Sequence, residues 1–569
     1  MAALPSVYAA LLLCLGLTTA SPILARAPSD YAPVPATCPS TQLVRQADGL
    51  SGAESDWVGK RYAKASASLE QWLQGIDPSF VAGNGSWGPR GSWSEWNGQQ
   101  GKAPVIALTS SGGGYRAMLS GAGVIKAFDG RETGTGSAVS GLYQALTYEA
   151  GLSGGSWLLS SIAGNNYPTI SSLQTNLWEQ QLMYDLLVPQ ILLSSQAASV
   201  YADVQQSIAA KQAAGFAESI IDPWGRLLSY GLLYGQEGGI DTTISEIATY
   251  SNFTSYNAPY PVITALGVNR FEGICIPQPN ATQYEFHPFE FGSWDQGVDA
   301  FVDSKYLGTH FSNGVPTGNC IINFDNLGFI LGTSSNVFGS VCGPVPAANT
   351  TEASSLALVE NLAELTAPGQ PGVPESAIFA PYPNPFQNFP SSTLVAAQST
   401  LELVDGGVGV APQGDPIWPF INRPGIDVII VNENSADTAY NFPNGSEIVN
   451  TYNAAQAAGL TRMPPIPPVA TFVSQQLNQK PTFFGCNSPD AATIIWIPNF
   501  NYTFQSGQPT AKIQYNVTET RGMISNGVQI ANFGGKEGWP LCLACGIMAK
   551  SGETLPDGCT QCLEDYCFN

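Results

Sequence analysis

Short apolar runs alternate along the chain with segments that fit a helix. Residues 105–108, 145–148 and 428–431 are compact apolar runs of the kind that form buried strands. Residues 156–163 follow the second run and are compatible with a helix. This alternation predicts an α/β fold with a central, mostly parallel or mixed β-sheet flanked by helices.

The first 20 residues have the features of a secretory signal peptide. An apolar run at residues 7–17 precedes the small residues 18–20, and it is too short to span a bilayer. We expect a Pro- and Ala-rich lead-in at residues 21–40 and one large catalytic domain at residues 41–569. The last residues contain no hydrophobic tail. We therefore expect a secreted protein without a transmembrane segment or a GPI anchor.

The composition narrows the possible classes of function. Hydrophobic residues make up 44% of the chain and charged residues only 11%, which argues against intrinsic disorder. The formal net charge of −22 repels phosphate backbones, so nucleic acid is not an expected partner. Attraction to an anionic membrane through a basic patch is equally disfavoured. No obligate protein partner is indicated.

Glycosylation sequons agree with export. Asn-x-Ser/Thr occurs seven times, which predicts a glycosylated surface. The acceptor residues are Asn84, Asn252, Asn280, Asn349, Asn444, Asn501 and Asn516.

Ten cysteines remain once Cys14 is removed with the signal peptide, and five of them lie in the segment 540–569. Two Cys-x-x-Cys pairs in this segment, at 542–545 and 559–562, also have the spacing of a zinc ribbon. An even number of cysteines in an exported chain favours disulfides. We expect a C-terminus held by disulfides and no bound metal.

A candidate nucleophile lies in the sequence Gly-Leu-Ser-Gly-Gly at residues 151–155. It matches G-x-S-x-G, and it sits between a strand-like run and a helix-compatible run. Glycines on both sides allow the tight turn that exposes the serine, as in the nucleophile elbow of α/β-hydrolases. The pattern predicts Ser153 as a nucleophile.

A second glycine-rich turn occurs upstream, at Ser-Gly-Gly-Gly-Tyr-Arg in residues 111–116. Consecutive glycine N–H groups at the start of a helix can bind a tetrahedral oxyanion. The same residues also fit the dinucleotide-binding pattern G-x-G-x-x-A, with Glu132 as the acidic residue. An exported glycoprotein has little use for a dinucleotide, so we favour the oxyanion role and expect no cofactor.

A serine nucleophile normally needs a histidine base, but the chain contains only His287 and His310. Neither follows Asp405, a carboxylate that ends an apolar strand at a Gly-Gly turn. Asp405 could take the serine proton itself and form a Ser–Asp dyad. A carboxylate is a weak base, so such a site must exclude water and raise its pKa.

These motifs together resemble those of the fungal lysophospholipase/phospholipase B family, which is related to the catalytic domain of cytosolic phospholipase A. The resemblance rests on residues 111–118, 151–157 and 404–407, and it continues through 289–295, 324–329, 434–437, 481–486 and the terminal cysteines. It implies a serine esterase that removes fatty acyl chains from lysophospholipids and diacyl phospholipids at a micelle or membrane surface.

The resemblance also implies residue roles. Ser153 would be the nucleophile, Asp405 the base, Gly113 and Gly114 the oxyanion donors, and Arg116 the ligand of the substrate phosphate. Asp295 and Asp325 would be structural. The segment 408–416 departs from the family pattern and is longer by about two residues, which bears on the lining of the site next to Asp405. Two alternatives stay open: an inactive lipid-binding glycoprotein, and a secreted general serine esterase or peptidase.

Overall fold

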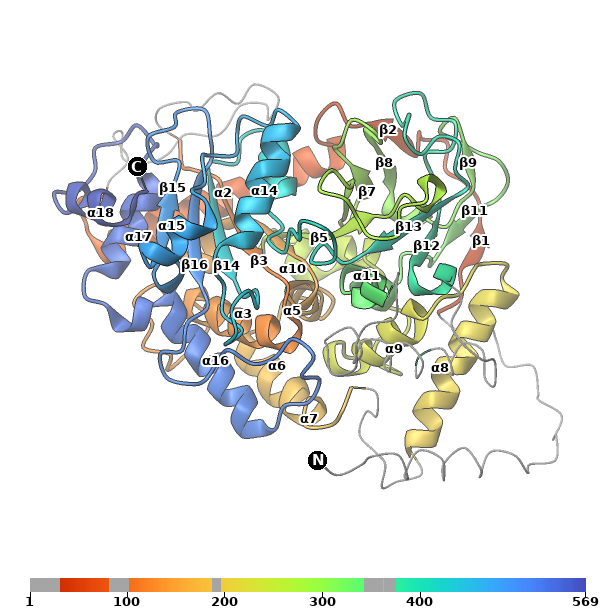
Figure 1. Ribbon diagram of the computed structural model, residues 1–569, viewed down its shortest axis with the longest axis horizontal. Coiled ribbons are helices and arrows are strands. Elements are labelled where there is room, and N and C mark those ends of the chain that lie inside the picture. Colours follow the sequence, from red (N-terminus) through yellow and green to blue (C-terminus); the bar gives the residue numbers. More distant parts are fainter. Residues whose placement is uncertain (1–30, 81–101, 187–195, 342–361, 363–374, 569) are drawn as a thin grey trace.

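The computed structural model of the protein describes residues 31–80, 102–186, 196–341, 362 and 375–568 (Figure 1). The signal peptide, the first half of the lead-in, and the sequons at Asn84 and Asn349 lie outside these residues. Among the residues described, no helix combines the length and the apolar character needed to cross a membrane.

A twelve-stranded mixed sheet forms the centre of the molecule (Figure 1). Its middle consists of five parallel strands, whose spatial order is β16 (Thr493–Pro498), β14 (Val428–Glu433), β3 (Ile106–Ser110), β4 (Leu146–Gly151) and β5 (Tyr260–Gly267). Every residue of these strands is buried. Burial on both faces accounts for their continuous apolar runs, because parallel strands are covered by helices on both sides. The predicted mixed sheet is confirmed.

Antiparallel strands extend the sheet at both edges. One edge carries β15 (Thr482–Phe484), and the other carries β6 (Gln283–Phe286), β7 (Glu290–Ser293), β8 (Ala300–Asp303) and β2 (Val44–Gln46). A branch from β5 adds β13 (Thr400–Val404) and β12 (Ala380–Pro383). Two separate two-stranded antiparallel sheets complete the strands: β1 (Val34–Ala36) with β11 (Cys320–Ile322), and β9 (Phe311–Ser312) with β10 (Val315–Pro316).

Helices surround the sheet. The longer ones are α2 (Gly52–Ile76), α3 (Gly114–Phe128), α5 (Gly154–Ala163), α8 (Gln196–Ala213), α9 (Ile221–Leu232), α11 (Leu327–Ser334), α14 (Ser446–Ala457), α16 (Val517–Ala531), α17 (Trp539–Met548) and α18 (Cys559–Tyr566). Helices α3 and α16 lie side by side (Figure 1), and they approach closely at Gly123 and Gly527. A Cβ on Gly123 would lie 2.5 Å from the Cα of Gly527, so only glycine permits this spacing.

The predicted local elements are largely confirmed. Residues 428–431 lie within β14, residues 105–108 overlap β3, and residues 156–163 lie within α5. The strand predicted at 145–148 begins one residue too early, because Ala145 ends the short helix α4 (Leu142–Ala145) and β4 begins at Leu146.

Disulfides hold the C-terminal segment, as expected. Helices α17 and α18 are joined by Cys542–Cys562 and Cys545–Cys559, and Cys486–Cys567 ties the chain end to the loop after β15. A fourth disulfide, Cys38–Cys320, joins the β1 and β11 region. All four sulfurs of the two Cys-x-x-Cys pairs are consumed in disulfides, so the zinc-ribbon alternative is wrong.

The sequons within the described residues lie on or near the surface. Asn280, Asn501 and Asn516 are exposed, and Asn252 and Asn444 are half-buried. The side-chain oxygen of Asn516 caps α16 by accepting a hydrogen bond from the Glu519 N–H at 3.0 Å.

Candidate functional site

The sheet brings the predicted site residues together at one level. Parallel strands β3 and β4 end side by side, with Ser110 paired to Gly151. Strand β5 continues the row, because Ile263 pairs with Gly151. Strand β13 runs antiparallel to β5, with Val404 paired to Leu266. The next residue, Asp405, therefore lies near the end of the sheet where β4 ends.

Ser153 occupies a strained turn between β4 and α5. Its φ of 52° and ψ of −120° lie in a region that non-glycine residues rarely adopt. The turn is held by hydrogen bonds at both of its peptide groups. Its N–H donates to Ser334 Oγ at 3.0 Å, and its carbonyl accepts from the Trp157 N–H at 3.0 Å. This strand–turn–helix geometry is the one that the glycine pattern predicts.

Asp405 lies against the serine hydroxyl. It is buried, its carboxylate lies next to the Ser153 hydroxyl, and it accepts a hydrogen bond from the Gly407 N–H at 2.7 Å. Burial raises the pKa of Asp405 to about 6, and the neighbouring Ser153 hydroxyl and Gly407 N–H offset part of the shift. A carboxylate in this state is a stronger base than a solvated one, as the sequence argument requires.

The glycine loop at residues 112–114 lies on the other side of Ser153. A Cβ on Gly112 would lie 3.2 Å from the Cβ of Ser153, so the loop is in direct contact with the serine. Gly113 and Gly114 have φ values of 133° and 60°, and a Cβ on Gly114 would lie 2.8 Å from the carbonyl oxygen of Thr510. Both positions therefore need glycine, and Gly114 is also the first residue of α3.

Arg116 is buried beside this loop. Its Nε donates to the Asn434 carbonyl at 2.9 Å, and its Nη1 donates to the Gln508 carbonyl at 2.7 Å and to Thr510 Oγ1 at 2.9 Å. Its Nη2 lies next to Gly113, where it would overlap a Cβ. Burial lowers the pKa of Arg116 to about 10, and no carboxylate of the described residues forms an ion pair with it. Arg116 is therefore a buried residue and not a surface ion pair.

None of the described contacts of the two histidines involves Ser153 or Asp405. His287 is buried, and its Nδ1 lies 2.6 Å from the Tyr260 hydroxyl. Burial lowers its pKa to about 3. His310 is exposed.

Carboxylates near His287 do not form a convincing metal site. Glu54 and Glu290 lie near the imidazole, but Glu54 is paired with Arg423 at 2.7 Å and Glu290 with Arg45 at 2.6 Å. A cation would have to compete with two guanidinium groups that already balance these carboxylates.

Asp295, Asp325 and Glu132 have structural partners. Asp295 accepts from the Gln283 N–H and the Trp418 indole, Asp325 accepts from the Ser245 N–H, and Glu132 accepts from Ser171. These contacts support the structural role expected for the two aspartates, and they leave Glu132 without the ribose role of the dinucleotide alternative.

Two supporting residues were not found by sequence reasoning. Ser334, at the end of α11, links the Ser153 N–H to the Thr264 carbonyl of β5. Asn336 accepts from the Asp405 N–H at its carbonyl, and its side chain donates to the Leu403 carbonyl at 3.2 Å. Neither lies in a recognisable motif, so no local signal in the sequence points to them.

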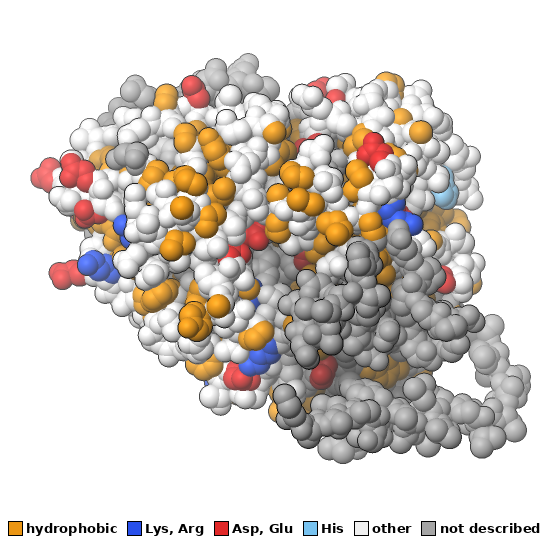
Figure 2. All heavy atoms as spheres, viewed as in Figure 1, with side chains coloured by type: hydrophobic (Ala, Val, Ile, Leu, Met, Phe, Trp, Pro, Cys, Tyr) orange, Lys and Arg blue, Asp and Glu red, His pale blue; other side chains and the backbone are white. Residues whose placement is uncertain are grey.

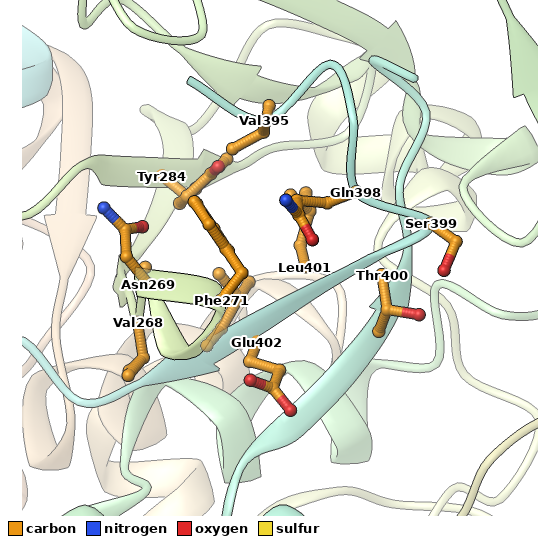
Figure 3. A pocket seen from close by; sticks show the side chains of 12 residues that line it. Val268, Asn269, Phe271, Tyr284, Val395, Gln398, Ser399, Thr400, Leu401 and Glu402 are labelled. Carbon is orange, nitrogen blue, oxygen red and sulfur yellow. The ribbon is translucent and has the colours of Figure 1, made fainter. Parts of the chain in front are cut away.

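A separate cavity of about 180 Å³ lies beside β13 (Figure 3). Its lining includes Tyr284, Phe271 and Leu401, but not Ser153 or Asp405. Leu403 reaches this cavity only two residues before Asp405. The cavity is therefore adjacent to the site along the chain but is not the site itself.

Comparison with known proteins assigns the family. Residues 106–569 match the family model described as the lysophospholipase catalytic domain. The chain is 36% identical to lysophospholipase 2 of Aspergillus fumigatus, over 97% of this chain and 96% of that protein. It is also 36% identical to lysophospholipase 1 of Saccharomyces cerevisiae, over 95% of this chain and 84% of that protein. The chain belongs to the lysophospholipase family, which confirms the resemblance seen in the motifs.

A solved structure confirms the fold class. The structure of human GIVD cytosolic phospholipase A2 aligns with 90% of this chain and 69% of its own, with a TM-score of 0.65 at 18% sequence identity. The same protein has been solved in complex with methyl gamma-linolenyl fluorophosphonate, and that structure aligns with a TM-score of 0.62. At this identity the likeness bears on the fold alone.

Proposed function

We propose that this chain is a secreted, glycosylated lysophospholipase/phospholipase B that hydrolyses fatty acyl esters of lysophospholipids and of diacyl phospholipids. One observation carries the proposal: the hydroxyl of Ser153 lies next to the buried carboxylate of Asp405, with the glycine loop packed against the serine. Family membership supplies the substrate class. The catalytic machinery lies in one domain that spans residues 41–569.

The reaction proceeds through an acyl-enzyme. Ser153 Oγ attacks the ester carbonyl carbon while its proton passes to Asp405. The N–H groups of Gly113 and Gly114 stabilise the oxyanion of the tetrahedral intermediate. The C–O bond to the glycerol oxygen then breaks, and Asp405 returns the proton to that oxygen. Water attacks the acyl-enzyme with Asp405 as base, which releases the fatty acid and restores Ser153.

Arg116 binds the substrate phosphate through the donors of Nη2. Three acceptors hold its Nε and Nη1, so the guanidinium plane is fixed before substrate arrives. Nη2 faces the glycine loop, on the side of the site where the ester carbonyl would lie. The absence of an ion-pair partner among the described residues leaves its charge available for an anion.

Apolar contacts, not long-range charge, bring the enzyme to lipid. Val410 is 62% exposed on the segment after Asp405, and its N–H donates to the Pro277 carbonyl at 3.0 Å, beside the exposed Ile276. These side chains belong to an apolar rim next to the site. Figure 2 shows many apolar and few basic side chains on one face of the molecule, as the net charge of −22 would lead one to expect.

A substrate panel tests this function. We expect the wild-type protein to release fatty acid from lysophosphatidylcholine much faster than it hydrolyses a short acyl ester that lacks phosphate. In Arg116→Lys, the loss of the fixed planar donors should reduce kcat/KM for lysophosphatidylcholine about 10- to 150-fold, the equivalent of about 1.5–3 kcal/mol, with less effect on the short ester. Arg61→Lys is the matched control, because Arg61 is equally buried but bonds to carbonyls at the start of β4.

The panel also separates the alternatives. Equal losses on both substrates in Arg116→Lys would contradict the phosphate role. Turnover of peptides or short esters without any preference for phospholipid would identify a general serine esterase or peptidase. Lipid binding without fatty acid release would identify an inactive lipid-binding glycoprotein.

The pKa of Asp405 predicts how activity falls at acid pH. The base must be unprotonated, and its pKa is raised to about 6. We therefore expect kcat/KM to fall about tenfold per pH unit below pH 6 and to level off above it, measured with lysophosphatidylcholine from pH 4 to 7.

The raised pKa has the opposite effect on stability, because the folded state then binds the proton more tightly than the unfolded chain does. The contribution of Asp405 to stability should thus decline between about pH 4 and pH 6, as activity rises. An acid limb centred near pH 4 would contradict a buried aspartate base.

A further inference from the structure

A group of buried carboxyl groups lies near the glycine loop, next to peptide groups that bond to it. Asp415 follows the loop after Asp405, Glu433 ends β14, and Glu447 lies in the first turn of α14. Asp415 and Glu433 are only 2% and 0% exposed, and Glu447 is 9% exposed. No described lysine or arginine forms an ion pair with any of the three.

Three of the four carboxylate oxygens of Asp415 and Glu433 accept no hydrogen bond from any other residue. Neither carboxylate oxygen of Asp415 accepts a hydrogen bond from a donor, and Glu433 Oε2 also lacks one. The other Glu433 oxygen accepts from the Ser435 N–H at 2.6 Å. The carboxyl groups of Asp415 and Glu433 lie within hydrogen-bonding reach of each other. Two carboxyl groups can form such a bond only when one of them carries a proton.

The charges around the pair favour keeping that proton. Glu447 faces it from α14, and Asp437 faces it from the loop after β14. Arg116 on α3 is a nearby cation, but it bonds to carbonyl and hydroxyl oxygens rather than to the pair. Asp405 adds a further negative charge near Glu447. Burial and these neighbouring carboxylates raise the pKa values of Asp415, Glu433 and Glu447.

The peptide groups next to the pair anchor the glycine loop. The carbonyl of Gly414, the residue before Asp415, accepts from the Gly112 N–H at 3.1 Å. The carbonyl of Asn434, the residue after Glu433, accepts from Arg116 Nε at 2.9 Å. The Asn434 N–H donates in turn to Ser111 Oγ at 2.6 Å. Both flanks of the loop therefore depend on the spacing between segments 414–415 and 433–434.

We propose that Asp415 and Glu433 are positioning residues that share one proton, and that this proton holds the glycine loop in the geometry that serves Ser153. The proposal rests on the proposed function of the site. When the proton is lost, two adjacent buried anions repel each other with no donor between them. The repulsion separates residues 414 and 434, which move the anchors of Gly112 and Arg116. The shared proton then sets the alkaline limit of activity, as Asp405 sets the acid limit.

The variant Asp415→Asn tests the shared proton. An amide has nearly the same volume and donates a hydrogen bond to Glu433 that does not titrate. We expect wild-type kcat/KM for lysophosphatidylcholine to fall about tenfold per pH unit on its alkaline limb, and Asp415→Asn to fall less than about threefold over the same range. The acid limb should not change. Assays in the presence of a chelator ensure that no divalent cation replaces the proton.

Asp325→Asn is the matched control. Asp325 is also buried, has one oxygen without a donor, and has a pKa raised to about 6 by burial, but it lies before α11 and bonds to Ser245. Its pH profile should equal that of the wild type. An alkaline limb that is the same in the wild type and in Asp415→Asn would overturn the proposal. If Asp415→Asn does not fold, Glu433→Gln replaces the other member of the pair, and an unchanged alkaline limb there has the same meaning.

Thermal unfolding provides a readout that does not depend on catalysis. Because the pKa of Asp415 is raised, its contribution to the free energy of unfolding of the wild type is present at low pH and is lost as the pH rises above the usual aspartate range. The Tm of Asp415→Asn relative to the wild type should therefore increase with pH, and a pH-independent difference would contradict the shared proton. If the protein releases no fatty acid but shows this Tm trend, the result contradicts the proposed function and still supports the proton shared by Asp415 and Glu433.

Discussion

Replacing Ser153 with alanine is expected to abolish fatty acid release, with a loss of at least about 10³-fold in kcat/KM. The hydroxyl removed is the atom proposed to attack the ester, and among the described residues it is the one side-chain hydroxyl that interacts with Asp405. Alanine leaves the turn as it is, because the bonds that hold Ser153 involve its peptide groups. The measurement is fatty acid release from lysophosphatidylcholine, together with circular dichroism and the Tm.

Ser160→Ala is the control for this prediction. Ser160 lies two turns further along α5, is buried, and has a hydroxyl without a hydrogen-bond partner. Its loss should leave activity within about threefold of the wild type, since removing an unpartnered hydroxyl breaks no hydrogen bond. If Ser153→Ala retained comparable activity, the nucleophile assigned to this family member would be wrong.

Asp405→Asn is expected to lower kcat/KM by about 10³-fold or more while the protein still folds. The amide oxygen can still accept from the Gly407 N–H, which is bonded to Asp405 at 2.7 Å, so the turn after β13 is retained. The amide cannot take the proton of Ser153, and no described contact links either histidine to Ser153 or Asp405. Single-turnover acylation by an activated ester would show the loss directly.

Asp295→Asn controls for the change from carboxylate to amide. Burial raises the pKa of Asp295 to about 6, as it does for Asp405, and both of its oxygens accept hydrogen bonds. Its activity should stay close to that of the wild type. Near-normal turnover in Asp405→Asn, with correct folding, would mean that another group or water accepts the proton.

The strands and the candidate dyad were accessible to sequence reasoning because their signals are local. Residues 428–431 consist only of β-branched residues and lie within a strand that is buried on both faces. The glycines at residues 151, 154 and 155 are required there because backbone atoms approach too closely for a Cβ. Asp405 was marked by its position between an apolar strand and two glycines. The boundary at Ala145 was missed because helix α4 and strand β4 adjoin without a breaking residue.

Other parts of the site could not be predicted, because they depend on segments that are distant in sequence. Ser334 and Asn336 follow an apolar helix, and nothing in their neighbours indicates that they bond to the residues around Ser153 and Asp405. Arg116 could be interpreted from its motif either as a surface ion pair or as a phosphate ligand. Its burial against Asn434 and Gln508 decides against the first.

The sequence by itself determined the local elements, the paired cysteine-rich C-terminus, the candidate nucleophile and the candidate base. Each of these depends on residues within one turn or one strand, where spacing and side-chain chemistry act directly. Only the tertiary structure decided which cysteines pair, that Ser153 meets Asp405 from 252 residues away, and that Asp415 meets Glu433. Strand register and helix packing set those distances, and burial then shifts the pKa values on which the proposed chemistry depends.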